Sequence, residues 1–152
     1  MTTSVLFVCL GNICRSPMAE AALRQECARA GKTMIIDSAG IRDWHTGNPP
    51  DDRAQAVAAR YGAPIDHLSA RPVRVADFRT FDHIIAMDND NLSNLKSMAP
   101  SDGSAKLSLF LDLLEGRNGQ DVIDPYYEAD EAFETTWADV VAGAKALIAK
   151  LS

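Results

Sequence analysis

The sequence has few cysteines, no long hydrophobic run and no cluster of basic residues. Its three cysteines are an odd number, and two of them lie close together, unlike the disulfide framework of a small secreted domain. No stretch approaches the roughly 20 apolar residues of a membrane span, and the first four residues lack the basic region of a signal peptide. We therefore expect a cytoplasmic protein with no membrane partner.

Positive charge is also scarce, because the 152 residues carry a formal net charge of −6. The basic residues are scattered and form no stripe, which argues against a nucleic-acid partner. Hydrophobic residues make up 47% of the chain, and a chain of this length buries roughly 70% of its unfolded surface. We expect residues 1–152 to form a single domain, present as a monomer or a weak dimer.

Short apolar runs alternate along the chain with segments of helical pattern. Strands are expected at residues 5–8, 34–38, 83–87 and 106–109, and helices at residues 16–30, 52–61, 91–96 and 133–151. The first run is continuously apolar, which is typical of a strand buried on both faces. This alternation predicts an α/β three-layer sandwich of the Rossmann-like or flavodoxin-like kind, with a central four-stranded parallel sheet and helices on both faces.

The loop between the first expected strand and helix carries the clearest chemical signal. It consists of Cys9, Leu10, Gly11, Asn12, Ile13, Cys14, Arg15 and Ser16. Cys9 ends the strand, at the sheet edge where parallel α/β proteins bind ligands. The unpaired N–H groups of the following helix bind anions and stabilise a thiolate. The loop is therefore a candidate phosphate site with Cys9 as its nucleophile.

Other residue types in the loop fit the same role. Arg15 can fold back and give two parallel donors to phosphate oxygens. Gly11 permits a tight turn, and Asn12 tolerates a left-handed backbone, so that successive N–H groups can point inward as an anion nest. The Ser16 hydroxyl can donate to the sulfur.

Other interpretations of this loop fit less well. A buried packing cysteine and a surface arginine would explain Cys9 and Arg15 alone, but not the accompanying Gly, Asn and Ser-Pro. Zinc would need further spaced cysteines or histidines, so we expect no metal. A nucleotide-binding P-loop would end in Gly-Lys-Ser or Gly-Lys-Thr, which is absent here.

With Pro17, the loop resembles the signature of the low molecular weight protein tyrosine phosphatases. The resemblance continues at residues 37–40, 81–88 and 124–127, and so covers the whole chain. It implies hydrolysis of phosphotyrosine in proteins or peptides, and of small aryl phosphates, through a cysteinyl-phosphate. It also implies inhibition by inorganic phosphate and vanadate, and no cofactor.

The same resemblance assigns roles outside the catalytic pair Cys9 and Arg15. It makes Asp124 the general acid, Trp44 and Tyr126 the walls of a deep slot, and Tyr127 either the outer edge of that slot or an inward-packed residue. Ser38 and Asp88 would brace the phosphate loop. The remaining loop residues would contact the substrate: Leu10, Gly11, Asn12, Ile13, Cys14 and Ser16.

The other cysteines and the histidines need separate interpretations. Cys14 lies near enough to Cys9 along the loop for a disulfide, and we expect reversible oxidation of this pair. Cys27 falls within the first helix and is expected in the core. The three histidines show no ligand spacing, so no chemistry is assigned to them.

Two alternative functions remain open. A thioredoxin-coupled arsenate reductase looks like the same fold, but it uses two further cysteines after the third strand, where residues 80–90 contain none. A non-catalytic phosphate-binding module would need neither the nucleophile Cys9 nor the proton donor Asp124.

Overall fold

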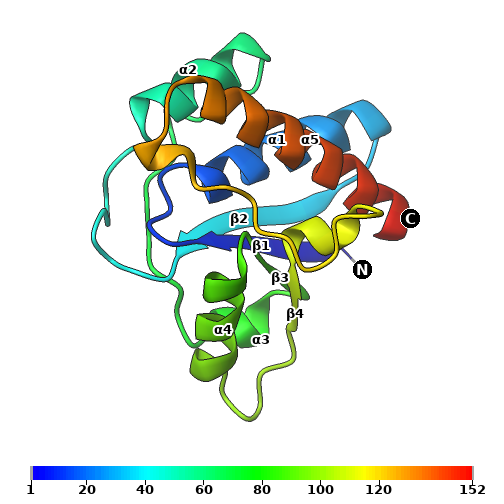
Figure 1. The fold of residues 1–152 in the computed structure, drawn as a ribbon. Coiled ribbons are helices and arrows are strands. Elements are labelled where there is room, and N and C mark those ends of the chain that lie inside the picture. The colour runs from blue at the N-terminus through cyan, green and yellow to red at the C-terminus, as the bar shows by residue number, and fades with distance from the viewer. Residues whose placement is uncertain (1, 152) are drawn as a thin grey trace.

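A four-stranded parallel sheet forms the centre of the computed structural model, which describes residues 2–151 (Figure 1). Its strands are β1 (Thr3–Cys9), β2 (Met34–Gly40), β3 (His83–Ala86) and β4 (Lys106–Leu109). They lie in the order β2-β1-β3-β4, and each neighbouring pair is parallel. The predicted sheet is confirmed.

Helices cover both faces of the sheet. Figure 1 shows α1 (Arg15–Ala30), α2 (Asp52–Arg60) and α5 (Glu131–Leu151) on one face, and α3 (Asp77–Thr80) and α4 (Asn89–Met98) on the other. The β1 side chains alternate between the two resulting cores. Val5 and Phe7 pack on the α1 and α5 side, whereas Leu6 and Val8 pack on the α4 side. The continuously apolar run in the sequence reflects this burial on both faces.

Polar caps define the ends of the principal helices. The Asp51 carboxylate accepts from the Arg53 N–H at the start of α2, and the Asp88 carboxylate accepts from the Asn91 N–H at the start of α4. Helix α1 ends at Gly31, whose φ of 66° is left-handed. The two aspartates thus satisfy backbone N–H groups that have no partner within the first turn of α2 and α4.

The predicted element boundaries differ from the structure in a few places. Helix α4 is longer at both ends than the predicted 91–96, and α5 begins two residues before 133. The four-residue α3 was not predicted, because it is too short to show a helical period. The 3₁₀ turns η1 (Phe110–Leu113) and η2 (Pro125–Tyr127) were likewise not predicted.

The strand order explains where a ligand site forms. From β1 the chain crosses to β2 on one side and then to β3 on the other, so the connections diverge between β1 and β3. In open parallel sheets this divergence leaves a crevice beyond the carboxyl ends of the strands. Within residues 2–151, no helix is sufficiently long and apolar to cross a bilayer.

Candidate active site

A pocket of about 270 Å³ opens at this edge of the sheet. Three segments distant in sequence build it: the loop after β1, the loop after β2, and the segment around η2. Its lining residues are Cys9, Leu10, Gly11, Ile13, Cys14, Arg15, Trp44, His45, Asp124, Tyr126 and Tyr127. The structure therefore gathers most of the predicted site residues in one place.

Cys9 lies in this pocket with 3% of its surface exposed. Its sulfur lies 3.0 Å from the Ser16 hydroxyl and accepts from the Asn12 N–H at 3.3 Å. Asn12 has a φ of 59°, and it is the only non-glycine residue in the range 2–151 with a positive φ. This left-handed turn directs the Asn12 N–H at the sulfur, so the loop backbone itself stabilises a thiolate.

Asn12 and Ser16 lie beneath the pocket and do not line it. Both are buried, and the Asn12 amide donates to the hydroxyls of Ser16 at 2.9 Å and Ser38 at 3.0 Å. Ser38 in turn donates to the buried Glu20 carboxylate at 2.7 Å. Burial raises the pKa of Glu20, although its bonds to Ser38 and Arg24 oppose that shift.

Arg15 is the cation of the pocket, and it is buried at 3% exposure. Its guanidinium donates to the Asp88 carboxylate at 2.7 Å, to the Val122 carbonyl at 3.0 Å and to the Asp124 carboxylate at 3.4 Å. Burial alone would lower the pKa of Arg15, but the nearby Cys9, Asp124 and Asp88 raise it. Arg15 is therefore a fixed positive charge in a protein of negative net charge.

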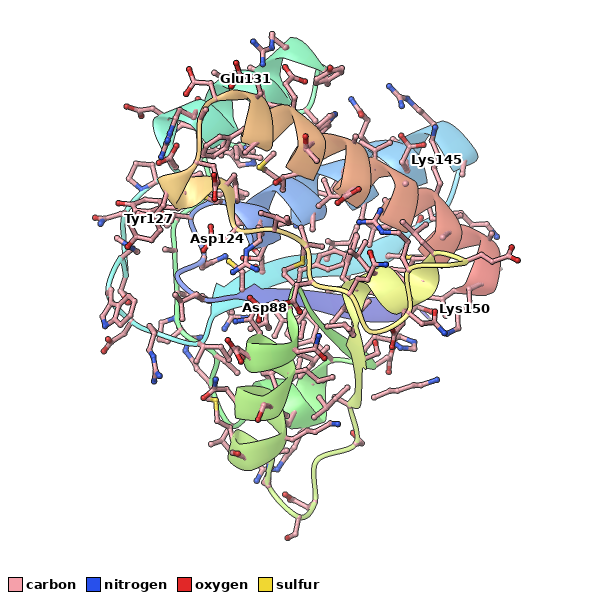
Figure 2. All side chains as sticks on the ribbon, in the orientation of Figure 1. Asp88, Asp124, Tyr127, Glu131, Lys145 and Lys150 are labelled. Carbon is pink, nitrogen blue, oxygen red and sulfur yellow. The ribbon has the colours of Figure 1, made fainter. Side chains whose placement is uncertain are left out.

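Asp124 enters the pocket from the far end of the chain. Its carboxylate accepts from the Tyr126 N–H at 3.1 Å and so caps η2, with Pro125 in the first position of that turn. The side chain is 37% exposed. Figure 2 shows Asp88 and Asp124 at the same edge of the sheet, with Tyr127 on the outer side.

Aromatic side chains form the mouth of the pocket. Trp44 is 65% exposed and Tyr127 is 89% exposed, so Tyr127 forms the outer edge and does not pack inward. The Tyr126 and Tyr127 rings meet edge to face with centroids 4.8 Å apart. Arg53 lies over the Tyr126 ring at 5.8 Å from its centroid and donates to the Tyr126 carbonyl at 2.9 Å.

His45 also lines the pocket, although sequence analysis assigned it no role. Its ring is packed against Gly11, where a β-carbon would lie 3.0 Å from the His45 Cδ2 atom. Only the folded loops bring these residues together, since nothing in the local sequence pattern links His45 to residue 11. Gly11 does not have the positive φ that would demand glycine; its missing side chain instead leaves room for the His45 ring.

Cys14 lines the same pocket and is 4% exposed. Burial, followed by the negative charges of Asp51 and Cys9, raises the pKa of the Cys14 thiol well above its usual range. Cys9, Cys14 and Cys27 are all free thiols. Cys27 is buried in the core, as predicted. Across residues 2–151, no group of three acidic, histidine or cysteine side chains is arranged to hold a metal ion.

Comparison with known proteins decides the family. The model of the low molecular weight phosphotyrosine protein phosphatases matches residues 4–152. The chain belongs to this family. It is 45% identical to the low molecular weight protein-tyrosine-phosphatase YfkJ of Bacillus subtilis, over 97% of this chain and 95% of that protein.

Solved structures of other phosphatases share the complete fold. The protein tyrosine phosphatase of Entamoeba histolytica superimposes with a TM-score of 0.92 at 36% identity, covering 99% of this chain and 97% of that one. The Drosophila arginine phosphatase DARP gives a TM-score of 0.92 at 31% identity, covering 97% of each chain. The resemblance seen in the sequence is therefore confirmed, and the chain is a low molecular weight phosphotyrosine phosphatase.

Proposed function

We propose that this phosphatase hydrolyses phosphotyrosine in proteins or peptides, and small aryl phosphates, with Cys9 as nucleophile, Arg15 as phosphate clamp and Asp124 as general acid and base. The observation that carries the proposal is the convergence of these three residues in one pocket, although they come from opposite ends of the chain. Two segments remote in sequence supply a nucleophile, a fixed cation and a carboxyl group at one place.

In the first step, the Cys9 thiolate attacks phosphorus and an S–P bond forms. The P–O bond to the phenol breaks, and its electron pair remains on the leaving oxygen, which takes a proton from the Asp124 carboxyl group. Arg15 and the loop N–H groups stabilise the negative charge on the other phosphate oxygens. The substrate phosphate would take the place beside Arg15 that Asp124 occupies in the free protein.

In the second step, the Asp124 carboxylate takes a proton from water. The resulting hydroxide equivalent attacks phosphorus, the S–P bond breaks, and its electrons return to Cys9 as thiolate. Inorganic phosphate leaves, and Asp124 is again protonated. The Ser16 hydroxyl and the Asn12 N–H, both directed at the sulfur, stabilise this leaving thiolate.

The walls of the pocket support an aryl phosphate as substrate. Cys9 is almost completely buried, while Trp44 and Tyr127 project from the mouth. The phenyl ring of an aryl phosphate spans the depth from this mouth to the Cys9 sulfur and stacks against the aromatic walls. The short side chain of phosphoserine does not reach the sulfur. Inorganic phosphate and vanadate should compete with the substrate for the loop from Cys9 to Ser16.

The alternatives from the sequence are less well supported. Cys27 is the only cysteine outside the pocket, and it lies 12 residues after Arg15 on α1, about 18 Å along the helix axis. It is too distant to pass on a disulfide in an arsenate reductase. A binding module would not require a carboxyl group beside the phosphate clamp, where it opposes anion binding.

The direct test uses two variants with a set of aryl phosphates of graded leaving-group pKa. We expect Cys9→Ser to abolish turnover and still bind vanadate. Asp124→Ala should slow poor leaving groups far more than good ones, because only poor leaving groups need the proton. A uniform loss across the set would remove Asp124 from the acid role, and binding without any turnover by the unmodified protein would favour a module.

The substrate class needs its own comparison, because one structural neighbour is described as an arginine phosphatase. A phosphotyrosine peptide and a matched phosphoarginine peptide are assayed side by side for kcat/KM. A preference for phosphotyrosine supports the proposal, and a preference for phosphoarginine contradicts it. EDTA should leave both rates unchanged.

A further inference from the structure

We infer that Arg71 is a positioning residue for the nucleophile, acting through Asn12. This inference rests on the proposed function of Cys9. Arg71 does not line the pocket. Its backbone N–H donates to the side-chain oxygen of Asn12 at 3.0 Å, although 59 residues separate the two in sequence.

The Arg71 side chain is clamped between two carboxylates. Its guanidinium donates twice to Asp37 of β2, at 3.2 and 3.0 Å, and twice to Asp77 of α3, at 3.0 and 3.2 Å. The Arg71 side chain is 18% exposed and that of Asp77 is 9% exposed. Paired donors of this kind fix the guanidinium in direction as well as position.

The backbone on either side of Arg71 is fixed against the end of β2. The Gly40 N–H donates to the Arg71 carbonyl at 2.8 Å, and the Val73 N–H donates to the Gly40 carbonyl at 2.9 Å. Gly40 itself lies against the phosphate loop, since a β-carbon there would come within 3.0 Å of Gly11 and 3.1 Å of the Asn12 nitrogen. The clamp and this short ladder together hold the Arg71 N–H at a set position beside Asn12.

That N–H sets the direction of a chain of hydrogen bonds. Because the Asn12 oxygen accepts from Arg71, the Asn12 amino group must point the other way, toward the hydroxyls of Ser16 and Ser38. Ser16 then accepts from Asn12, which leaves its own proton to be donated to the Cys9 sulfur 3.0 Å away. Without the Arg71 N–H as donor, either end of the buried Asn12 amide could pair with the two hydroxyls, and the chain of hydrogen bonds would lose its direction.

The direction of this chain matters for the reaction, because a thiolate accepts hydrogen bonds and donates none. A Ser16 hydroxyl that donates to sulfur favours the thiolate, both in the free enzyme and when the S–P bond breaks. A Ser16 hydroxyl turned toward the Ala39 carbonyl, 3.4 Å away, would not. Arg71 thus contributes to catalysis from outside the pocket, with Ser16 as the last member of the chain.

The test compares Arg71→Ala with Arg79→Ala. Arg79 also donates to a carboxylate, that of Asp102, but the pair is exposed and does not contact the loop, which makes it a matched control. The readouts are kcat and KM for an aryl phosphate, the melting temperature, and the pH midpoint of Cys9 alkylation. The alkylation is measured on the peptide that contains Cys9. The other titratable groups that line the pocket are unchanged in each variant: Cys14, Arg15, His45, Asp124, Tyr126 and Tyr127.

Arg71→Ala keeps the backbone N–H but removes the guanidinium clamp that holds it beside Asn12. We expect the released N–H to lower kcat by up to about tenfold, the value of roughly one hydrogen bond to the sulfur. KM should change little, and the alkylation midpoint should move to higher pH. Arg71→Lys should fall between Arg71→Ala and the unmodified protein, because an ammonium cannot bond both carboxylates in pairs. If Arg71→Ala is too unstable to assay, the same pattern is required of Arg71→Lys. Arg79→Ala should change none of these values.

A double-mutant cycle separates positioning from general stability. Asn12→Gly removes the amide and still permits the left-handed turn, so Arg71→Ala should cost no further activity in that background. Additive losses would overturn the inference, as would an unchanged alkylation midpoint or a kcat that falls only in step with melting temperature. If the unmodified protein hydrolyses no aryl phosphate, the proposed function fails, while the alkylation midpoints still decide the role of Arg71.

Discussion

The floor and the walls of the pocket are built in different ways. The floor is the loop from Cys9 to Ser16, in which the nucleophile and the cation are each 3% exposed and held by several hydrogen bonds. The walls are Trp44 and Tyr126, with Tyr127 at their outer edge, and both Trp44 and Tyr127 are mostly exposed. Bonds to remote parts of the chain fix the floor, whereas Trp44 and Tyr127 stand at the surface, where the Tyr127 ring meets the Tyr126 ring edge to face.

This difference assigns separate tasks to the two regions. Transition-state stabilisation requires donors whose positions are set before the substrate arrives, and a buried, hydrogen-bonded floor provides them. Recognition of a protein substrate requires apolar area at the surface, where aromatic side chains give large contacts at small entropic cost. Changes to the floor should therefore act on kcat, and changes to the walls on KM.

Oxidation of the floor should give the largest effect. Peroxide converts the Cys9 thiolate to a sulfenic acid; the Cys14 thiolate then attacks that sulfur, the S–O bond breaks, hydroxide leaves and takes a proton from solvent, and a disulfide forms. We expect complete loss of activity, recovered by added thiol. Because burial raises the pKa of Cys14, little of it is thiolate at neutral pH, and disulfide formation should become faster as pH rises.

The matched variants for this experiment are Cys14→Ser and Cys27→Ser. Cys14→Ser should oxidise without forming the disulfide and recover poorly, whereas Cys27→Ser should behave like the unmodified protein. The mass of the loop peptide and the recovered activity report the outcome. Full recovery of Cys14→Ser would show that the second cysteine gives no protection.

Arg15→Lys should be the next largest effect, with kcat lowered about 10²–10³-fold. A lysine cannot reproduce the separate bonds to Asp88 and Val122 while also facing the phosphate. Steady-state kinetics on an aryl phosphate measure the loss, and Arg117→Lys, in a partly exposed pair with Asp139, is the control. A loss confined to KM would place Arg15 in binding alone and weaken the contrast between floor and walls.

Trp44→Ala should act on the walls only, raising KM for a phosphotyrosine peptide about tenfold with kcat nearly unchanged. Its exposed side chain contributes little to the core, so the melting temperature should stay constant. Ile35→Ala, which removes a similarly exposed apolar side chain on β2, is the control. A fall in kcat that matches the rise in KM would mean that the wall also orients the reacting phosphate.

The sequence predicted the floor far better than the walls and the supports. Cys9 to Ser16 are contiguous, so their strand-loop-helix context can be recognised locally. Asp124, Trp44 and Tyr126 were assigned through family resemblance alone, because contacts between remote loops leave no local period. His45 and Arg71 were missed for the same reason: His45 packs on Gly11, and Arg71 reaches Asn12 only after the chain has folded.

Asp51 connects the floor to α2 and should give the smallest effect. Its N–H donates to the Ile13 carbonyl at 2.8 Å, and its carboxylate caps the helix and pairs with Arg53. Burial alone would raise the pKa of Asp51, but the Arg53 bonds outweigh it and lower the pKa. A lowered pKa adds stability that is present above the unfolded value and is lost as pH falls through the folded value.

We therefore expect Asp51→Ala to lower the free energy of unfolding by about 1 kcal/mol at pH 7, and by less as the solution is acidified below the ordinary aspartate range. Urea denaturation at a series of pH values measures this. Asp52→Ala, one residue later and outside the cap, is the matched control. Because the Asp51 N–H remains bonded to Ile13, kcat should hardly change; a large loss of kcat without loss of stability would show that the floor depends on the cap carboxylate as well as on its own hydrogen bonds.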